Sequence, residues 1–589
     1  MTTVKALRVS VGQHSDKGRK EVNQDFHGVL VPKEPLLSAK GIAIALADGI
    51  GSSEVSQIAS EFAVQSLLED YYCTSEAWSV KKSVERVLTA TNSWLHSRTR
   101  QSQYRYDQDR GYVCTLSALI IKSTTAHIFH VGDTRIYRVH ADALEQLTDD
   151  HRVRVSEGQS YLSRAVGFNP QIEIDYQALQ LEKGDVFFLA SDGVYEYVDD
   201  AFIADVVWRE RGEKGDQGDL DRAARAIVDE AFQRSSHDNL TVQIVAIDEL
   251  PSADARELHQ RVPELALPPL LEARDTLDGY RIVREVHGSN RSHIYLAIDI
   301  ETHALVILKT PSVDMRADPA YLERFLMEEW VARRINSAHV LKPCQQTRER
   351  HYLYVATEYI DGQTLSQWMI DHPRPSLETV RGIVEQIAKG LQAFHRLEML
   401  HQDLRPDNIM IDKTGTVKII DFGATRVAGI VEMAAANEPG DIMGTAQYTA
   451  PEYFLGEAGS ALSDQFSLGV ITYQMLSGCL PYGTAVAKSR TQAAQGKLQY
   501  ASVLHQDCEI PVWIDGVLAR AVQPNPLKRY EALSEFVHDL RQPNAAFLNK
   551  TRPALVDRHP ARFWKGVSAI LAAIIVLLLF VRFGIQPAK

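Results

Sequence analysis

The sequence has few cysteines and no excess of basic residues, and both shortages exclude classes of protein. Its 589 residues include five scattered cysteines, without a CxxC pair or a histidine at zinc-ligand spacing. This usage is typical of reduced, mostly buried thiols and excludes a disulfide framework or a zinc site. Lysine and arginine number 63 against 76 aspartates and glutamates, a net charge of -13. An acidic surplus argues against binding through phosphate contacts, so we expect no nucleic-acid partner.

Long hydrophobic runs are missing except near the C-terminal end. The polar start, Met1–Lys5, has no apolar stretch behind it, so we expect no cleaved secretion signal. Residues 566–581 are all apolar or small, and continuing to 585 gives about the twenty residues that a bilayer crossing requires. The alternative is a buried core helix, but hardly any sequence follows that could cover it.

Basic residues precede this apolar segment, in 542–565, and few follow it. The positive-inside rule therefore predicts a basic juxtamembrane segment and one transmembrane helix, 566–585. The protein is expected at the cytoplasmic (inner) membrane, in contact with lipid through this helix, with the rest of the chain in the cytoplasm.

Two compositions alternate in the remaining chain. Residues 1–250 show short β-branched runs and helical stretches grouped apart, which predicts a β-sandwich flanked by helices. Residues 251–277 are punctuated by proline, as in a linker. A strand-rich stretch, 278–312, precedes a mostly helical one, so 278–541 is expected to form a second domain with two lobes. The predicted fold class is therefore α+β and multidomain.

Aspartates at the ends of predicted strands are the first candidates for chemistry. Asp48 follows the apolar run 42–47, and a carboxylate there is costly unless a cation neutralises it. Carboxylate, backbone carbonyl and water are the ligands that Mg2+ or Mn2+ prefers, and two such ions activate a water for attack on phosphorus. Taken singly, each Asp-Gly pair is more typical of a turn. The four aspartates in this setting are Asp25, Asp48, Asp192 and Asp238.

The ordered motifs of residues 1–250 resemble those of the PP2C family of metal-dependent protein phosphatases. They are NQD (23–25), DGIG (48–51), CTLSALI (114–120), VGDTRIYR (131–138), LTDDH (147–151), LSRAVG (162–167), SDG (191–193) and DNLT (238–241). The resemblance implies hydrolysis of phosphoserine or phosphothreonine esters at a centre of two Mn2+ or Mg2+ ions. The implied ligands are Asp25, Asp48, the carbonyl of Gly49, Asp192 and Asp238. Asp133, in the GDTR motif, is either a ligand of a third ion, as in some bacterial relatives, or a structural turn residue.

Two positions depart from that family's pattern. The family places an arginine five residues before the NQD aspartate, where it binds substrate phosphate. This chain has Lys20 there, beside Arg19, and we expect these two residues to bind phosphate. Lysine would do so as a compact point charge, because it lacks the forked set of N–H donors of an arginine guanidinium. Ser53 stands where many relatives have a histidine that protonates the leaving group. Either a metal-bound water or another group takes that role, or turnover on poor leaving groups is slow.

A second ordered series lies in residues 278–541. Lys309 ends the apolar strand VILK and needs an anionic partner, which we expect to be Glu328 on the next predicted helix, with Glu329 as the alternative register. Phosphoryl transfer requires Mg2+ held against the phosphates, a cation on those phosphates and a carboxylate that receives the substrate's hydroxyl proton. These roles fall respectively to Asp421 and Asn408, to Lys309, and to Asp403.

This series, from VILK through HQDLRPDN (401–408), IIDFG (419–423) and TAPE, resembles the eukaryotic-like Ser/Thr protein kinases. The resemblance implies ATP and Mg2+ as cofactors and proteins as substrates. It also pairs Glu452 with Arg529 as an architectural contact. The residues implied in nucleotide binding are Lys309, Glu328, the hinge residues Glu358 and Ile360, Asn408, Asp421 and Gly288.

The glycine-rich loop of the kinase pattern is reduced. The expected glycines fall on His287, Ser289 and Ser292, and only Gly288 remains. Because glycine lets backbone amides approach phosphate closely, this loss should weaken ATP binding or slow turnover without removing catalytic groups. The leading hypothesis is a membrane-anchored enzyme with opposed kinase and phosphatase activities, whose phosphatase also acts on its own kinase domain. The alternative is an active phosphatase gated by a nucleotide-binding pseudokinase scaffold.

Overall fold

The computed structural model describes residues 7–140, 143–156, 159–211, 219–251, 265–289, 292–345, 348–428, 430, 446–505, 510–543, 568 and 570–575. The chain divides into two units. Unit 1 comprises residues 1–363, 389–402 and 408–439, and unit 2 comprises 364–388, 403–407 and 440–589. The division falls inside the second predicted domain, whose strand-rich part belongs to unit 1.

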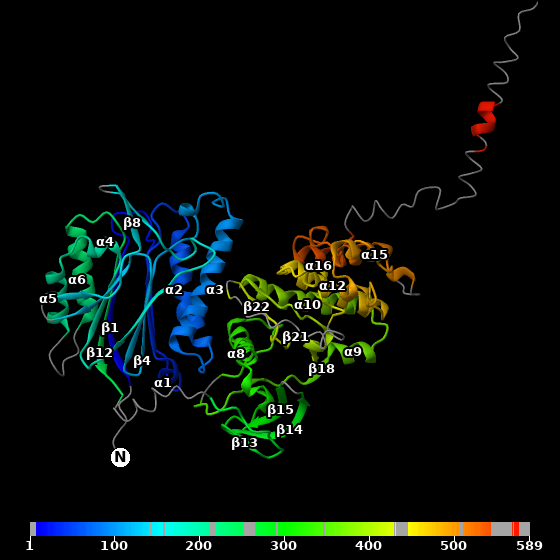
Figure 1. Cartoon of the computed structure of the whole chain (residues 1–589), viewed down its shortest axis with the longest axis horizontal. Coiled ribbons are helices and arrows are strands. Elements are labelled where there is room, and N and C mark those ends of the chain that lie inside the picture. The colour runs from blue at the N-terminus through cyan, green and yellow to red at the C-terminus, as the bar shows by residue number, and fades with distance from the viewer. Residues whose placement is uncertain are drawn as a thin grey trace, which may run out of the picture. The chain divides into compact units, whose positions relative to one another are not determined.

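The N-terminal part of unit 1 contains two five-stranded antiparallel sheets, visible as the blue, cyan and green strands of Figure 1. Their strand orders are β1-β12-β11-β6-β7 and β10-β5-β4-β3-β2. The strands are β1 (Arg8–Asp16), β2 (Phe26–Leu30), β3 (Ile42–Ala47), β4 (Leu116–Lys122), β5 (Thr125–Val131), β6 (Arg135–Val139), β7 (Leu144–Gln146), β10 (Asp175–Gln180), β11 (Val186–Ala190) and β12 (Leu240–Glu249).

Side chains of alternate strand residues enter two different cores. In β11, Phe187 and Leu189 pack between the sheets with residues such as Ile44 of β3. Phe188 and its same-face neighbours pack instead with the helices that cover the first sheet. Because strand side chains alternate with period two, one fully buried strand supplies both cores.

Two pairs of helices accompany these sheets. The helices α2 (Ser56–Cys73) and α3 (Val80–Gln101) pack beside the second sheet, and α5 (Asp200–Glu210) and α6 (Leu220–Gln233) pack beside the first (Figure 1). The short helices are α1 (Leu36–Lys40), η1 (Gln108–Arg110) and α4 (Asp192–Tyr195). The predicted sandwich flanked by helices is confirmed.

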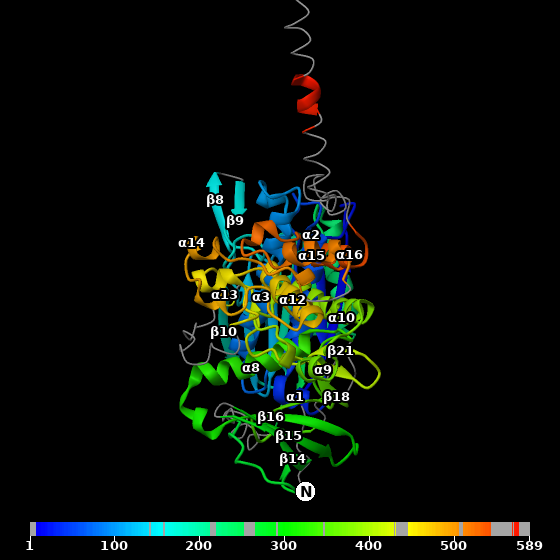
Figure 2. The ribbon, with the colours of Figure 1, turned by 90° about the vertical axis from the view of Figure 1, so that its right-hand side faces the viewer.

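A two-stranded ribbon, β8 (Arg152–Ser156) and β9 (Gln159–Leu162), forms a sheet of its own. Figure 2 shows it projecting from one end of the sandwich. Its first residue, Arg152, directly follows the LTDDH motif.

The rest of unit 1 is built on a third sheet, of order β13-β14-β15-β16-β17. Its strands are β13 (Thr276–Leu277), β14 (Tyr280–Gly288), β15 (Ser292–Asp299), β16 (Leu305–Pro311) and β17 (Val355–Glu358), with η2 (Val313–Ala317) and α8 (Pro319–Arg334) between the last two. Leu271 belongs to the core of this sheet, and Ala266 forms a bridge with Tyr352. Part of the predicted linker, 265–277, therefore packs with the second domain.

Short strands and helices complete the second domain. The strands are β18 (Gly362–Thr364), β19 (Met399–Leu400), β20 (Ile409–Asp412), β21 (Val417–Ile419) and β22 (Arg426–Val427). The helices are α9 (Leu365–Asp371), α10 (Leu377–Arg396), η3 (Pro406–Asn408), η4 (Pro451–Leu455), α12 (Ala461–Ser477), α13 (Ala485–Lys488), α14 (Gln492–Gln495), η5 (Val503–His505), α15 (Val512–Ala521), η6 (Pro526–Lys528) and α16 (Leu533–Arg541). In unit 2, Phe466 and Val470 of α12 pack with Tyr482 and Val522.

The predicted transmembrane helix, 566–585, lies mostly outside the described residues. Residues 568 and 570–575 of it are helical. Within the described ranges, no helix combines the length and the apolar character needed to cross a bilayer. The predicted juxtamembrane segment also lies outside these ranges, except for residues 542 and 543.

Candidate functional site

The aspartates predicted to bind metal interact with one another at strand ends of the sandwich. Asp48 follows β3, Asp192 begins α4 directly after β11, and Asp238 precedes β12. Burial raises the pKa of Asp48 well above its usual value, and the charges of Asp25, Asp192 and Asp133 raise it further. Burial, with the charges of Asp133 and Asp238, raises the pKa of Asp192 to about 7. Acidic groups held this close require a cation to remain ionised at neutral pH.

Hydrogen bonds position these aspartates but leave some of their carboxylate oxygens without a partner. Ser191 Oγ donates to Asp25 Oδ2 at 2.8 Å, and the Asp48 backbone N–H donates to Thr115 Oγ1 at 3.0 Å. Oδ1 of Asp25 and Oδ1 of Asp192 are buried and have no hydrogen-bond partner within the described part of the chain. Unsatisfied buried carboxylate oxygens are costly, and a bound cation would satisfy them.

Glycines next to two of these aspartates let backbone segments meet closely. A Cβ on Gly193 would lie 2.1 Å from the Asn239 carbonyl oxygen. A Cβ on Gly49 would lie 2.8 Å from both the Gln24 carbonyl oxygen and the Ser56 side chain. The Asp-Gly pairs therefore serve close packing, and this packing is what brings the aspartates together.

The donor set fits hard divalent cations. Among the residues that the structure describes, no three His, Cys, Asp or Glu side chains form a ready-made metal site. Mg2+ usually binds one or two carboxylates and keeps several waters, so a preformed cage is not required. Asp25, Asp48, the Gly49 carbonyl, Asp192 and Asp238 are the residues that would hold such ions. Bound there, the ions would supply the activation of a water for attack on phosphorus.

Of the two predicted phosphate-binding residues, only Lys20 faces the aspartates. Its ammonium pairs with Asp238. Burial opposes the charged form of Lys20, but the hydrogen bond and charge of Asp238, with the charge of Asp48, raise its pKa overall. Arg19 instead lies over the Phe232 ring, with its guanidinium carbon 5.4 Å from the ring centroid. Lys20 is therefore the cation placed to meet a substrate phosphate.

Arg152 is a residue of this site that motif reasoning missed. Its Nε lies 2.5 Å from Asp133 Oδ2, its NH2 lies 2.7 Å from Asp192 Oδ2, and its NH1 lies 2.7 Å from Glu196 Oε1. One guanidinium thus bridges three carboxylates, among them Asp133, the candidate ligand of a third ion. A third ion at Asp133 would have to displace Arg152. The signal in the sequence was its position, directly after LTDDH.

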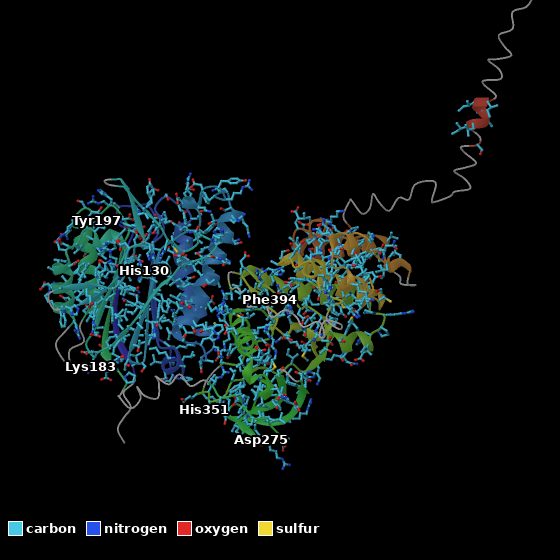
Figure 3. The ribbon with its side chains drawn as sticks, in the orientation of Figure 1. His130, Lys183, Tyr197, Asp275, His351 and Phe394 are labelled. Carbon is cyan, nitrogen blue, oxygen red and sulfur yellow. The ribbon has the colours of Figure 1, made fainter. Side chains whose placement is uncertain are left out.

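Ser53, at the position of the family's leaving-group histidine, has a structural role. Its Oγ donates to the Gly111 carbonyl at 2.8 Å and its carbonyl accepts from Gln24 Nε2 at 2.8 Å. His130, labelled in Figure 3, lies in β5 and is 1% exposed. Burial, with the nearby His151, lowers the His130 pKa to about 4, so it is a neutral core histidine. Neither residue is placed to donate a proton to a leaving group.

Three of the residues predicted for the kinase site lie together, and all three belong to unit 1. Lys309 Nζ donates to Glu328 Oε1 at 2.7 Å and to Oε2 at 2.8 Å, which selects Glu328 over Glu329. Glu329 pairs instead with Arg350, at 2.7 Å. Lys309 Nζ is also 3.6 Å from Asp421 Oδ1. Burial lowers the Lys309 pKa, but the charges of Glu328 and Asp421 outweigh it and raise the pKa, so the ammonium stays charged.

The residue after Asp421 anchors it to the core. Phe422 is 3% exposed, and its ring lies 5.7 Å from that of Phe394, which is labelled in Figure 3. Phe394 in turn lies 5.5 Å from His401 of the HQD motif. A buried Phe422 with Asp421 directed toward Lys309 is the arrangement that phosphoryl transfer requires of this motif.

At the position of the family's glycine-rich loop, after β14, two serines are joined by hydrogen bonds. The Ser289 N–H donates to the Ser292 carbonyl at 3.0 Å, and the Ser292 N–H donates to Ser289 Oγ at 3.1 Å. At the predicted hinge, Lys418 Nζ donates to both carboxylate oxygens of Glu358 at 2.7 Å. A nucleotide contact from Glu358 would therefore come from its main chain, as would one from the buried Ile360.

The remaining predicted residues fall in both units. Asn408, in unit 1, is 4% exposed, and its carbonyl accepts from the Ile420 N–H at 2.9 Å. Asp403, in unit 2, has Arg405 Nε 3.8 Å from its Oδ2. The expected architectural pair is present in unit 2, where Arg529 donates to both oxygens of Glu452, at 2.8 and 2.7 Å.

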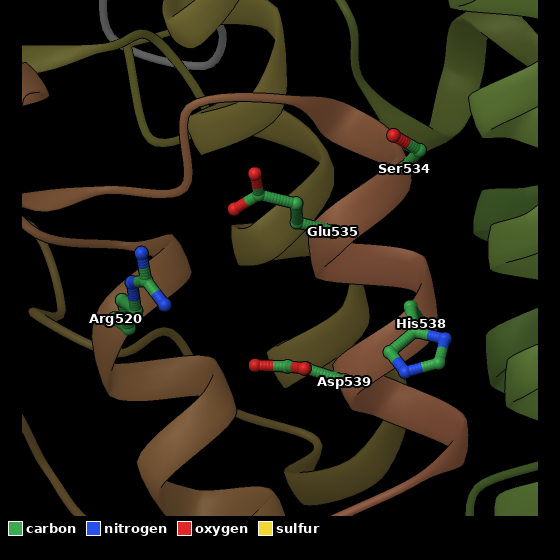
Figure 4. Close-up of a pocket in the computed structure, with 5 residues that line it drawn as sticks. All are labelled: Arg520, Ser534, Glu535, His538 and Asp539. Carbon is green, nitrogen blue, oxygen red and sulfur yellow. The ribbon is translucent and has the colours of Figure 1, made fainter. Parts of the chain in front are cut away.

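A separate surface hollow lies between α15 and α16 in unit 2 (Figure 4). Arg520 comes from α15, and the other lining residues, Ser534, Glu535, His538 and Asp539, come from α16. The Arg520 guanidinium lies 4.1 Å from the Tyr530 ring centroid. The hollow contains none of the predicted catalytic residues.

Comparisons with known families agree with this geometry. Residues 13–234 match the family described as protein phosphatase 2C, and residues 280–541 match the protein kinase domain. The chain therefore contains a PP2C phosphatase domain followed by a protein kinase domain.

Individual relatives resemble the kinase part. The chain is 34% identical to the Mycobacterium tuberculosis serine/threonine-protein kinase PknA over 213 residues, 35% of this chain and 49% of that protein. It is 26% identical to Bacillus subtilis PrkC over 270 residues, 44% of this chain and 40% of that protein. The chain thus spans less than half the length of these two relatives.

Two solved structures resemble one domain each. The Mycobacterium tuberculosis PknI kinase domain is 25% identical, with a TM-score of 0.36, over 46% of this chain and 99% of that one. A bacterial serine phosphatase is 19% identical, with a TM-score of 0.34, over 41% of this chain and 98% of that one.

Replacing Lys20 and Arg19 separately should distinguish their roles. We expect Lys20→Ala to lower phosphatase kcat/KM by about 10- to 100-fold, the loss typical of a hydrogen bond to a charged group. Arg19→Ala should leave it within about twofold, because a contact with Phe232 on the surface contributes little. The rate of phosphate release from a phosphopeptide would give kcat/KM for both variants. Equal losses in the two variants would contradict the assignment.

The raised aspartate pKa values predict how metal-free stability depends on pH. The Asp192 pKa is about 7 against an ordinary 3.8, so the folded state binds this proton more tightly than the unfolded state does. The contribution of the Asp192 proton to the stability of the folded state is therefore greatest at low pH, and it is lost as pH rises from 3.8 to about 7. With chelator present, Asp192→Asn should therefore lose less stability than wild type over this range, and Mn2+ should stabilise wild type more. Calorimetry at a series of pH values would measure the stability of both proteins. Parallel stability curves for wild type and Asp192→Asn would contradict the prediction.

Removal of Arg152 should create a cation site. In Arg152→Ala the carboxylates of Asp133, Asp192 and Glu196 lose their shared guanidinium, so we expect one additional Mn2+ to bind per chain. Arg152→Lys retains a cation and serves as the matched control. Titration calorimetry would count the bound ions, and unchanged stoichiometry in Arg152→Ala would show that Arg152 does not hold this position against a metal.

Proposed function

We propose that the chain is a membrane-anchored signalling enzyme with two opposed activities. The phosphatase domain hydrolyses phosphoserine or phosphothreonine esters with Mn2+ or Mg2+, and the kinase domain transfers the ATP γ-phosphoryl group to Ser or Thr hydroxyls. Its substrates are proteins, its own kinase domain among them. Covalent linkage supports this last point, because domains joined on one chain meet at a raised effective concentration, roughly millimolar for short linkers.

The observation that carries the kinase proposal is the Lys309–Glu328 ion pair with Asp421 beside it. Lys309 is oriented and kept charged by Glu328, so it can bind ATP phosphates. Asp421 would hold Mg2+ together with Asn408. Asp403 would accept the proton of the substrate hydroxyl as the γ-phosphoryl group passes to that oxygen, and ADP would leave.

In the phosphatase, the residues of the chain position the ester and neutralise charge. Lys20 would bind phosphoryl oxygens beside Asp238, and the carboxylates would hold the divalent ions. The charge of Arg152 would lower the pKa values of Asp133 and Asp192 and so offset part of the increase that burial causes. The proposed phosphatase activity therefore requires two divalent ions. The guanidinium of Arg152 would occupy the place beside Asp133 that a third metal ion could otherwise take.

The membrane location is proposed from the sequence. The apolar segment 566–585 and the basic residues before it support one crossing with both catalytic domains in the cytoplasm. At the inner membrane, an anchored kinase would meet neighbouring copies by diffusion in two dimensions.

A second candidate function is a pseudokinase scaffold that binds nucleotide and gates an active phosphatase. The observation that favours it is the serine-closed loop after β14, in which Ser289 and Ser292 take the place of two glycines. Side chains there reduce the approach of backbone amides to phosphate. The intact Lys309–Glu328–Asp421 group favours the active kinase.

Phosphate occupancy of the purified full chain separates these functions. After incubation with ATP, Mg2+ and Mn2+, we expect Asp48→Ala to carry more phosphate than wild type, because its phosphatase no longer removes it. Asp403→Ala should lower transfer by about 100- to 10,000-fold, the contribution of a positioned acid or base. The double variant Asp48→Ala/Asp403→Ala should carry almost no phosphate, because its kinase cannot add any. Mass spectrometry would measure occupancy.

Each alternative gives a different pattern in this experiment. Absence of phosphate in every variant, with ATP still bound, would favour the pseudokinase scaffold. Phosphate in equal amounts on wild type and Asp48→Ala would show that the phosphatase does not act on its own kinase domain.

A further inference from the structure

Helix α8 carries Glu328, and its outer side is covered by the phosphatase domain. Glu328 and Trp330 are two positions apart, a rotation of about 200° at 3.6 residues per turn, so they project from nearly opposite sides of the helix. Glu328 contacts Lys309, whereas Trp330 packs against the ring of Trp78, with centroids 6.1 Å apart. Both belong to unit 1. Trp330 is 0% exposed and Trp78 is 3% exposed.

Ion pairs surround this aromatic contact. Glu323 of α8 accepts from Lys82 and, at 3.2 Å, from Arg86, both on α3 of the phosphatase domain. At the other end of α8, Arg334 NH2 lies 2.7 Å from Asp70 Oδ2 on α2. The Arg334 side chain is only 4% exposed, so this pair is largely removed from water. Because these ion pairs are partly buried, salt screens their attraction much less than that of exposed pairs.

Helix α3 of the phosphatase domain also contacts the segment that leads to the catalytic loop of the kinase. Trp94 Nε1 of α3 donates to the Arg396 carbonyl at 3.0 Å, and Ser97 Oγ donates to Glu398 Oε1 at 3.1 Å. Glu398 precedes β19, after which comes His401 of the HQD motif. Residues on α3 therefore contact both α8 and the approach to the catalytic loop.

We propose that the α2–α3 surface of the phosphatase domain is the activating partner of the kinase, and that it holds α8 where Glu328 meets Lys309. Asp70, Trp78, Lys82 and Arg86 are then positioning residues for phosphoryl transfer, acting through α8. Position of this helix controls kinase activity because the Lys–Glu pair must form. The phosphatase domain thus has a second role, independent of its own chemistry.

Reversal of one interfacial charge tests the proposal. In the full chain, Asp70→Arg places a cation against Arg334, so α8 should leave its active position. We expect autokinase kcat to fall about tenfold, within the roughly 5- to 150-fold range of coupling between sites. The double variant Asp70→Arg/Arg334→Asp restores the pair with opposite polarity and should recover most of the rate. Recovery in the double variant would show that the loss passes through this pair, and retained phosphatase activity in the single variant would show that the loss is not general unfolding.

Controls separate this inference from the proposed kinase function on which it rests. Glu61→Arg reverses an exposed charge on the same helix and should leave the rate unchanged. Phosphatase activity should stay within about twofold in all variants, since Asp70 lies outside that site, and its retention shows that the domain folds. Should Asp70→Arg fail to fold, Lys82→Ala/Arg86→Ala removes the partners of Glu323 at partly exposed positions and should slow transfer instead.

The outcomes are distinct. No transfer by wild type would overturn the proposed kinase. Transfer by wild type that is unchanged in Asp70→Arg and in Lys82→Ala/Arg86→Ala would overturn the inference alone. A loss in Asp70→Arg that Arg334→Asp does not rescue would also overturn it, because the effect would not pass through this pair.

Discussion

Buried carboxylates must be balanced by positive charge, and both candidate sites depend on this constraint. In the phosphatase domain, burial and mutual repulsion raise the pKa values of Asp48 and Asp192, and Lys20 and Arg152 provide part of the compensation. In the kinase domain, Lys309 lies between Glu328 and Asp421. The cost of ionising buried acids is what makes each site ready for divalent cations and phosphate.

The two sites meet this constraint differently. The kinase cation belongs to a strand and its main partner to a helix, so the ion pair forms only when α8 has the right position. The phosphatase carboxylates belong to strand ends of one sandwich, and glycines such as Gly49 and Gly193 let those ends approach. The sandwich is thus suited to hold helix α8 of its neighbour in position, which gives a physical reason for the two domains to share one chain.

Motif order allowed much of both sites to be predicted. The Lys309–Glu328 and Glu452–Arg529 pairs were expected and are present, and so is the sandwich flanked by helices. The choice between Glu328 and Glu329 remained open, because adjacent residues on a helix face directions about 100° apart and only packing selects one. Arg152 was missed because its position after LTDDH is a weak signal by itself, and two of its partners, Asp192 and Glu196, are distant in sequence.

The sequence by itself determined the chemistry: which residues can carry charge, where strands end, and the order in which two families' motifs occur. These follow from local properties, since burial patterns and residue types are readable along the chain. Tertiary structure decided which charges meet. It directed Lys20 rather than Arg19 toward the aspartates, placed Arg152 among Asp133, Asp192 and Glu196, and set Trp330 against Trp78. Contacts between distant residues depend on how sheets and helices pack in three dimensions, which no local pattern encodes.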